Sequence, residues 1–166
     1  MDIPQGITIK IDEGKIIVSG AMGIVEQKFN SKHLEVKTDE KTIEVTNKTK
    51  ETKKIKAMVN TIKAHIKNAI KGVSEGYEKK LALVYAHFPV TIELKGKEIL
   101  VKNFLGEKTP RKAKIRGEAK VEVKGQEILV SGINKEDVTQ TASNLVKVTK
   151  IRAKDNRVFQ DGIYYE

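Results

Sequence analysis

The sequence contains an internal repeat, and this repeat restricts the possible fold more than any other feature. Residues 90–106 align with residues 7–23 without a gap, at an offset of 90 − 7 = 83. The identical aligned pairs are Thr8/Thr91, Ile9/Ile92, Ile16/Ile99, Val18/Val101 and Gly23/Gly106. A self-match at a fixed offset indicates one structural unit used twice. We therefore expect two similar units, covering residues 1–76 and 77–166.

Each unit is predicted to begin with short antiparallel strands. Apolar and polar residues alternate over 7–11 and an apolar run covers 16–18, a pattern typical of a hairpin with its turn at 12–14. A second hairpin is expected from 34–36 and 43–45, across a turn at 38–40. In the second unit we expect an opening strand at 81–88, hairpins at 90–101 and 120–130, and a last strand at 162–166. Leu34/Val121 is offset by 87 and Ile43/Ile128 by 85, so the second turn is expected to be two residues shorter.

A helix is predicted to end each unit. Apolar residues recur at three- and four-residue steps from Ile55 to Ile70, and Gly72 is expected to end this helix. Asn134 is the expected N-cap of the second helix, which has an acidic first turn. The second helix aligns with the first at offset 83, and together with the strands this predicts a tandem repeat of α+β units. The polar face of the first helix carries Lys53, Lys56, Lys63 and Lys67, which fit a solvated face and an RNA contact equally well.

The composition favours a polyanionic partner. Lys and Arg number 32 against 22 for Asp and Glu, which gives a net charge of +10. Nucleic acid is the first candidate for such a partner and an anionic membrane surface the second. Cysteine is absent, which excludes disulfides and thiolate metal sites. The sequence has neither a signal-peptide pattern at its start nor an apolar run near the ~20 residues that span a bilayer, so we expect a cytoplasmic protein.

No residues form a recognisable catalytic or metal site. His33, His65 and His87 lack metal-ligand spacing, and no cofactor-binding loop is present. Residues 72–76 match the Gly-x-Ser-x-Gly pattern of a hydrolase, but that nucleophile elbow needs a strand before the serine and a helix after it. Here a helix is expected first. A hydrolase using Ser74 is thus a weak alternative, and we predict that the protein is not an enzyme.

The positive charge is clustered in the second unit. The first basic cluster contains Lys108, Arg111, Lys112, Lys114 and Arg116, five positive charges in nine residues without an acid, and is expected to form a loop. The second contains Lys147, Lys150, Arg152, Lys154 and Arg157, with Asp155 as its one acid. All four Arg residues of the chain lie in these clusters. Because arginine offers phosphate a planar, bidentate donor fork, the second unit is the better candidate for binding RNA.

Several segments resemble a known family. These are Gly72-Val73, Gly76-Tyr77, Val84-Tyr-Ala-His-Phe-Pro89, Asn103-Phe-Leu-Gly-Glu-Lys108 and Arg157-Val-Phe-Gln-Asp-Gly-Ile-Tyr164. They are similar to the L-six family of large-subunit ribosomal proteins, in its archaeal and eukaryotic branch. The bacterial branch ends in a Gly-Lys-Gly motif, from which Phe159-Gln-Asp-Gly162 departs. The resemblance covers nearly the whole chain and suggests an archaeal protein.

The resemblance implies a fold, a function and a set of contact residues. The family is a tandem repeat of two α+β units, with a structural role on large-subunit rRNA near the sarcin–ricin loop and the base of the factor-binding stalk. Its C-terminal unit makes most RNA contacts, so the implied partners are this rRNA and neighbouring ribosomal proteins. We expect the protein to be monomeric within the ribosome, with no membrane partner, cofactor or metal. Carried onto this chain, and joined with the basic clusters, this gives as RNA-binding residues Asn103, Lys108, Arg111, Lys112, Lys114, Arg116, Lys150, Arg152, Lys154, Arg157 and Tyr164.

Three alternatives stay open at the level of sequence. Tyr85 and Phe88 either contact RNA or pack beneath the helix as strand core. Phe159 either stacks on a base or anchors the C-terminal tail. The whole protein is either a ribosomal component or a free nucleic-acid-binding protein that uses the same basic residues.

Overall fold

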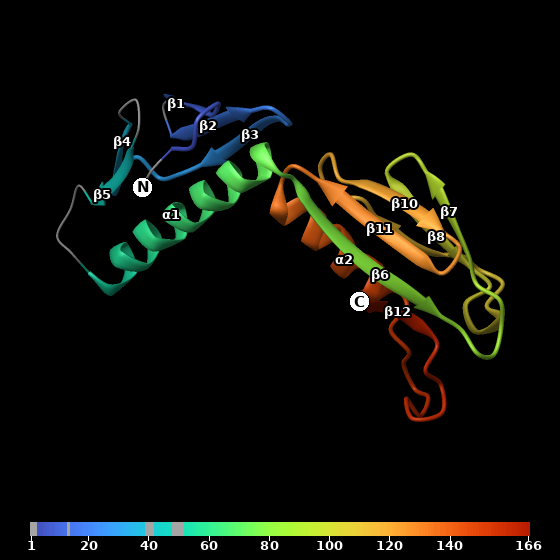
Figure 1. Ribbon diagram of the computed structural model, residues 1–166. Helices are drawn as coiled ribbons and strands as arrows, with labels where there is room; N and C mark the ends of the chain where they lie inside the picture. Colours follow the sequence, from blue (N-terminus) through green and yellow to red (C-terminus); the bar gives the residue numbers. More distant parts are fainter. Residues whose placement is uncertain (1–2, 13, 39–41, 48–51) are drawn as a thin grey trace. The chain divides into compact units, whose positions relative to one another are not determined.

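The chain forms two units, each built from antiparallel strands and a long helix (Figure 1). The computed structural model describes residues 3–12, 14–38, 42–47 and 52–166. Its compact units are Met1–Gly76 and Tyr77–Glu166. Within the described residues each unit has one α-helix, and its strands pair antiparallel. The predicted class, a tandem repeat of α+β units, is confirmed.

The first unit has two antiparallel sheets that contact helix α1 (Lys53–Ser74). Its described strands are β1 (Thr8–Asp12), β2 (Lys15–Gly20), β3 (Gly23–Lys28), β4 (Leu34–Thr38) and β5 (Ile43–Asn47). Strands β1, β2 and β3 form one sheet in that order, and β4 pairs with β5. Both predicted hairpins are present, although their turns at 12–14 and 38–40 include positions outside the described residues. Strand β3 was not predicted, because only Val25 of its residues is buried and no alternating pattern marks it.

Helix α1 begins and ends with identifiable caps. The hydroxyl oxygen of Thr52 accepts a hydrogen bond from the Ile55 N–H at 3.3 Å, as an N-cap does. The predicted end at Gly72 is wrong, because Gly72 is buried inside the helix. The left-handed residue is Gly76 (φ 77°), whose N–H donates to the Gly72 carbonyl at 3.0 Å. Ser74 lies in the last helical turn and its hydroxyl bonds the Lys71 carbonyl, so the strand–serine–helix order of a nucleophile elbow is absent.

The second unit has a four-stranded and a three-stranded sheet. Its described elements are β6 (Tyr77–Val84), β7 (Thr91–Lys95), β8 (Glu98–Lys102), the 3-10 turn η1 (Phe104–Gly106), β9 (Arg111–Lys114), β10 (Lys120–Lys124), β11 (Glu127–Gly132), α2 (Lys135–Val148) and β12 (Gly162–Tyr165). The strand orders are β10-β11-β6-β12 and β7-β8-β9. The N-cap Asn134 and the last strand are both confirmed: the side-chain oxygen of Asn134 accepts from the Glu136 N–H at 3.0 Å.

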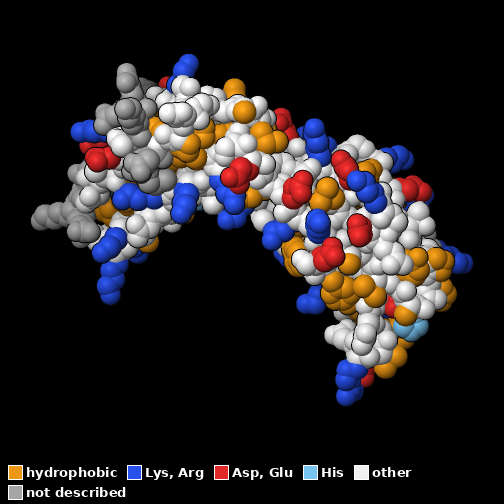
Figure 2. All heavy atoms as spheres, viewed as in Figure 1, with side chains coloured by type: hydrophobic (Ala, Val, Ile, Leu, Met, Phe, Trp, Pro, Cys, Tyr) orange, Lys and Arg blue, Asp and Glu red, His pale blue; other side chains and the backbone are white. Residues whose placement is uncertain are grey.

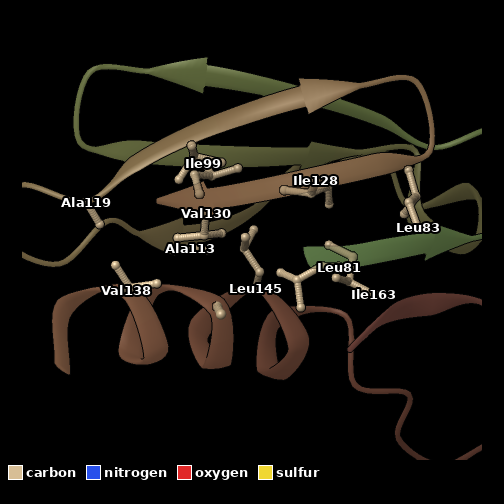
Figure 3. Packing of buried hydrophobic residues seen from close by; sticks show 12 residues of the cluster. Leu81, Leu83, Ile99, Ala113, Ala119, Ile128, Val130, Val138, Leu145 and Ile163 are labelled. Atoms are coloured by element: carbon tan, nitrogen blue, oxygen red, sulfur yellow. The ribbon is translucent and has the colours of Figure 1, made fainter. Parts of the chain in front are cut away.

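The core of the second unit lies between α2 and the strands. Figure 3 shows Val138 and Leu145 of α2 directed toward Ala113, Val130 and Leu81 on the strands. Val138, Ala142 and Leu145 of α2 are all 0% exposed. Their spacing of three and four residues places them on one helical face, so this face is completely covered by the sheets.

The repeat predicted from sequence appears in the strand registers. Ile9 pairs with Val18 in the first unit and Ile92 with Val101 in the second, so the offset of 83 is retained on both strands. The second hairpin requires a correction. Val36 pairs with Val45 and Val121 with Val130, so Val121 corresponds to Val36, not to Leu34. Both pairs have an offset of 85 (121 − 36 and 130 − 45), and the turn has therefore not lost two residues.

The opening strand of the second unit also differs from the prediction. Strand β6 runs from Tyr77 to Val84, and the chain from Tyr85 to Pro89 is not a strand. Tyr85 is 37% and Phe88 46% exposed. The interpretation of these two rings as core beneath the helix is therefore wrong.

The two helices differ in length, which gives the second unit its tail. Thr149 stands at the offset of 83 from Ile66, but α2 ends just before Thr149 whereas α1 continues past Ile66 to Ser74. Thr149 is 3% exposed, and its hydroxyl oxygen accepts a hydrogen bond from the Ile163 N–H of β12 at 3.0 Å. Residues 150–161 form the tail between α2 and β12. The hydrogen bond between Thr149 and Ile163 holds the two ends of this tail together.

Candidate nucleic-acid interface

The centre of the first basic cluster, Arg111 to Lys114, lies on an edge strand, not on the predicted loop. Among the strands that the structure describes, β9 pairs with β8 alone, with Lys112 opposite Leu100 and Arg111 opposite Val101. Successive side chains of a strand point to opposite faces. Ala113 is 3% exposed, whereas Lys112 and Lys114 are exposed. The alternation therefore directs two lysines to solvent from the same face of β9, with Arg111 on the opposite face.

Arg111 is held by several groups of the second unit. Its Nε and Nη2 atoms donate to the two carboxylate oxygens of Glu107 at 2.7 and 2.5 Å. Its Nη1 donates to the Val148 carbonyl at 2.8 Å, and the guanidinium lies 4.5 Å from the ring centroid of the buried Phe104. Hydrogen bonding from Arg111 lowers the pKa of Glu107 below its ordinary value. The guanidinium thus joins η1, β9 and the end of α2, and much of its charge is neutralised.

The structure brings the two basic clusters together at this arginine. Arg111 Nη1 also lies 3.4 Å from the carbonyl oxygen of Lys150, the first residue after the α2 C-cap. Lys108 and Arg116 flank β9 on either side and are both exposed. The Arg116 N–H is bonded to the buried Thr141 hydroxyl at 2.9 Å, which fixes the backbone from which that side chain leaves. Arg111 therefore links strand β9 to the start of the basic tail.

The tail has its own local structure. Arg152 and Lys154 are exposed, and Ala153 between them has a positive φ of 57°. The Arg157 guanidinium donates to Asp155 at 2.8 Å and remains 90% exposed. Side-chain and backbone hydrogen bonds from Arg157 lower the pKa of Asp155 below its usual value. Two of the predicted contact arginines, Arg111 and Arg157, therefore already have a carboxylate partner.

A buried carboxylate anchors the end of the tail to the turn after β6. The Asp161 side chain is 0% exposed, and its Oδ1 lies 2.8 Å from Nδ1 of His87. Because an ionised carboxylate only accepts, this ring nitrogen carries the hydrogen. The His87 N–H also donates to Asp161 at 3.3 Å. Burial raises the pKa of Asp161, but the hydrogen bonds from His87 and the backbone of Ala86 outweigh it, so the pKa lies below its ordinary value.

Aromatic contacts reinforce this anchor. The rings of His87 and Phe159 are stacked with centroids 4.8 Å apart, and the Lys154 ammonium lies 4.6 Å from the Phe159 centroid. Phe159 thus makes the anchoring contact that was one of its two predicted roles. The sequence did not predict the contact between His87 and Asp161, since they are 74 residues apart and match no ligand or catalytic motif.

The remaining predicted residues lie beside this anchor. Asn103 has a left-handed backbone (φ 58°), and its side-chain amide donates to the Pro89 carbonyl at 2.9 Å. The Tyr164 hydroxyl donates to the Gln160 carbonyl at 3.0 Å, and its side chain is among the exposed hydrophobic ones. The exposed hydrophobic residues of this region are Val84, Tyr85, Phe88, Val158, Tyr164 and Tyr165. In Figure 2, hydrophobic side chains gather beside a histidine in the second unit.

Comparison with known proteins identifies the family. The family model described as Ribosomal protein L6 matches residues 3–76 and 88–162, one segment for each unit. The Methanosarcina mazei protein named Large ribosomal subunit protein uL6 is 48% identical over 166 residues, which cover 99% of this chain and 93% of that protein. Proteins of the same name from Methanobrevibacter smithii and Staphylothermus marinus are 44% and 45% identical, and each alignment covers 99% of this chain. The resemblance seen in the sequence is thereby confirmed, and this chain belongs to the ribosomal protein L6 family.

Proposed function

We propose that this chain is a component of the large subunit of the cytoplasmic ribosome that binds large-subunit rRNA through its second unit. The family consists of structural ribosomal proteins and not of enzymes. The relatives named above carry the large ribosomal subunit in their names. The finer part of the proposal places the contact near the sarcin–ricin loop and the base of the factor-binding stalk, with neighbouring ribosomal proteins as further partners.

The observation that carries the proposal is the pair of outward lysines on β9. Lys112 and Lys114 leave the same face of an edge strand, and the Arg111 contact to the Lys150 carbonyl joins that strand to the basic tail. A phosphate backbone is recognised by such positive charge, and binding releases condensed counterions. RNA helices are recognised mostly by shape and by backbone contacts, which a rigid basic strand can supply.

The contacts of the predicted RNA-binding residues divide them into three groups. Lys108, Lys112, Lys114, Arg116, Lys150, Arg152 and Lys154 offer exposed charge to phosphate; of these, Lys112 has its Nζ 3.8 Å from a carboxylate oxygen of Glu98. Asn103, Arg111 and Tyr164 bond to the protein's own backbone carbonyls, so we assign them the positioning of the surface. Arg157 contributes to phosphate binding only by exchanging Asp155 for a phosphate oxygen.

The test is the salt dependence of binding to naked large-subunit rRNA. The double variant Lys112→Gln/Lys114→Gln removes two candidate phosphate contacts. The negative slope of log K against log salt should therefore become shallower by roughly 1.4–1.8. Lys120→Gln/Lys124→Gln is a matched control, because these exposed lysines lie on β10, the edge strand of the other sheet in the same unit. An unchanged slope in the β9 variant, or an equal fall in both, would contradict the proposal.

A second measurement separates a ribosomal component from a free nucleic-acid-binding protein. A ribosomal component co-sediments with large subunits at high salt and protects a defined rRNA region from chemical footprinting. A free binding protein is displaced by unrelated RNA and protects no fixed region. A footprint away from the sarcin–ricin loop and the stalk base would contradict the finer part of the proposal alone.

A further inference from the structure

Helix α1 of the first unit carries a row of lysines that is separate from the basic residues proposed above to bind RNA. This row, the lysine ridge, consists of Lys53, Lys56, Lys63, Lys67 and Lys71, all of them exposed. At about 100° per residue the five side chains fall within an arc of about 80°, and at about 1.5 Å per residue the ridge is about 27 Å long. Figure 2 shows basic side chains along the side of the first unit where α1 lies.

The ridge is unfavourable for the helix itself. Helix α1 contains no Asp or Glu in its 22 residues, and its N-terminus carries Lys53, Lys54 and Lys56 against the positive end of the helix dipole. Lys63 and Lys67 are like charges four residues apart, as are Lys67 and Lys71, and such pairs destabilise a helix. Among the described residues, Lys71 has Glu75 as a partner at 3.7 Å, whereas no carboxylate pairs with Lys63 or Lys67.

The second helix shows that this chain can build a helix with complementary charges. In α2, Glu136 and Asp137 occupy the first turn and Lys147 the last, which matches the helix dipole. A merely solvated face on α1 would gain stability from glutamates interleaved with the lysines. The absence of these acids over the whole helix therefore indicates that the ridge is suited to an external polyanion.

The side chains on and around the ridge restrict the class of ligand that it can bind. The large apolar residues of α1 are buried or half-buried within the unit, with Ile62, Ile66, Ile70 and Val73 among the buried ones, so no apolar face is left for insertion into a bilayer. No described helix is long and apolar enough to span a membrane. The ridge itself has no aromatic side chain on which a base could stack. What remains is a contact with phosphates, made by point charges without reading of bases.

The geometry points to the lysine ridge as a second RNA-binding surface, which binds the phosphodiester backbone of folded rRNA independently of β9. This inference rests on the proposed ribosomal function and adds the first unit to the RNA-binding part of the protein. Lys56, Lys63 and Lys67 form its centre, since they lie between Lys53 at the start of the helix and the Lys71–Glu75 pair at its end.

The experiment compares two triple variants of the full-length chain for binding to naked large-subunit rRNA. The ridge variant is Lys56→Gln/Lys63→Gln/Lys67→Gln. The control, Lys10→Gln/Lys28→Gln/Lys32→Gln, removes the same charge from exposed lysines elsewhere in the first unit. The ridge variant should lower the slope of log K against log salt by about 2–3 and weaken binding at 0.15 M salt on the order of 50- to 100-fold. Circular dichroism should show an unchanged helix content and an undiminished melting temperature, since repulsion within α1 is relieved.

The slopes of the ridge, control and β9 variants together decide whether the ridge binds RNA. An unchanged slope in the ridge variant with a lowered slope in the β9 variant would refute the ridge and leave the proposed function standing. Unchanged slopes in both would refute the proposed function as well. Equal losses in ridge and control variants would reduce the effect to net charge and overturn the inference. Ridge-dependent binding to phosphatidylserine vesicles, with RNA binding unaffected, would assign the ridge to a membrane surface and overturn it too.

Discussion

The buried carboxylate of Asp161 permits a sharp test of how the tail is held. Replacement by asparagine keeps the size of the side chain but removes its charge and one acceptor oxygen. The Asp161 side chain is 0% exposed, and its Oδ1 lies 2.8 Å from His87 Nδ1. In the variant this hydrogen bond is lost, or the asparagine amide becomes its donor. A hydrogen bond to a charged group contributes about 1.5–3 kcal/mol, so Asp161→Asn should destabilise the second unit by about 2–3 kcal/mol.

Tyrosine fluorescence during urea unfolding measures this effect selectively. The chain has no tryptophan, and all four tyrosines, Tyr77, Tyr85, Tyr164 and Tyr165, lie in the second unit. The expected loss corresponds to a shift of the midpoint by roughly 1–2 M urea. Trypsin should also cleave the tail faster, because the segment that contains Arg152 and Lys154 is no longer fixed at its end. Asp155→Asn is the control, since Asp155 pairs with an arginine that is 90% exposed; its midpoint should equal that of the wild type.

The same pair gives a pH dependence with a definite sign. The pKa of Asp161 in the folded protein lies below its ordinary value, so folding favours the carboxylate. The stabilisation is therefore complete above the unfolded pKa of about 3.9 and is lost as the pH falls through the lower, folded pKa. The midpoint gap between wild type and Asp161→Asn should thus narrow in acid. A gap that stays constant down to this range, or a variant as stable and as protease-resistant as the wild type, would refute the reasoning.

Three further substitutions test the packing described above. Arg111→Lys cannot hold both oxygens of Glu107 and a carbonyl at once, and should cost the second unit about 1.5–3 kcal/mol by tyrosine fluorescence. Leu145→Ala opens a cavity at a side chain that is 0% exposed and should cost about 2–5 kcal/mol in the same assay. Gly20→Ala places a Cβ 2.8 Å from Val73 Cγ2 and 3.0 Å from the Val73 carbonyl, so the first unit should lose about 1–3 kcal/mol when followed by circular dichroism.

The tandem architecture was predictable because it depends on patterns that the sequence displays directly. The offset of 83 between Thr8 and Thr91 survives as the same place in two hairpins. Asn134 was recognisable as a cap because the side chain that satisfies the helix N-terminus must be adjacent in sequence. Signals of this kind act over a few residues or repeat at a fixed distance.

Features that depend on the tertiary structure were not predictable in the same way. Strand β9 contains three basic residues and a single small apolar one, Ala113, so nothing in its composition resembles a strand, and pairing with β8 imposes the conformation. Gly72 looked like a helix end, but Gly76 takes the left-handed conformation there. The contact of Asp161 with His87 joins segments 74 residues apart, which no local pattern encodes.

Strand β9 has one more consequence, for the protein before it meets any RNA. An unpaired strand edge invites pairing with the edge of another chain, and lysines together with a neighbouring proline are common protections against this association. Strand β9 has such an edge, with Lys112 and Lys114 on it and Pro110 directly before it. We therefore expect the free protein to resist edge-to-edge association, because the lysines of one copy repel those of another. Once those charges are neutralised by phosphate, this protection is no longer needed.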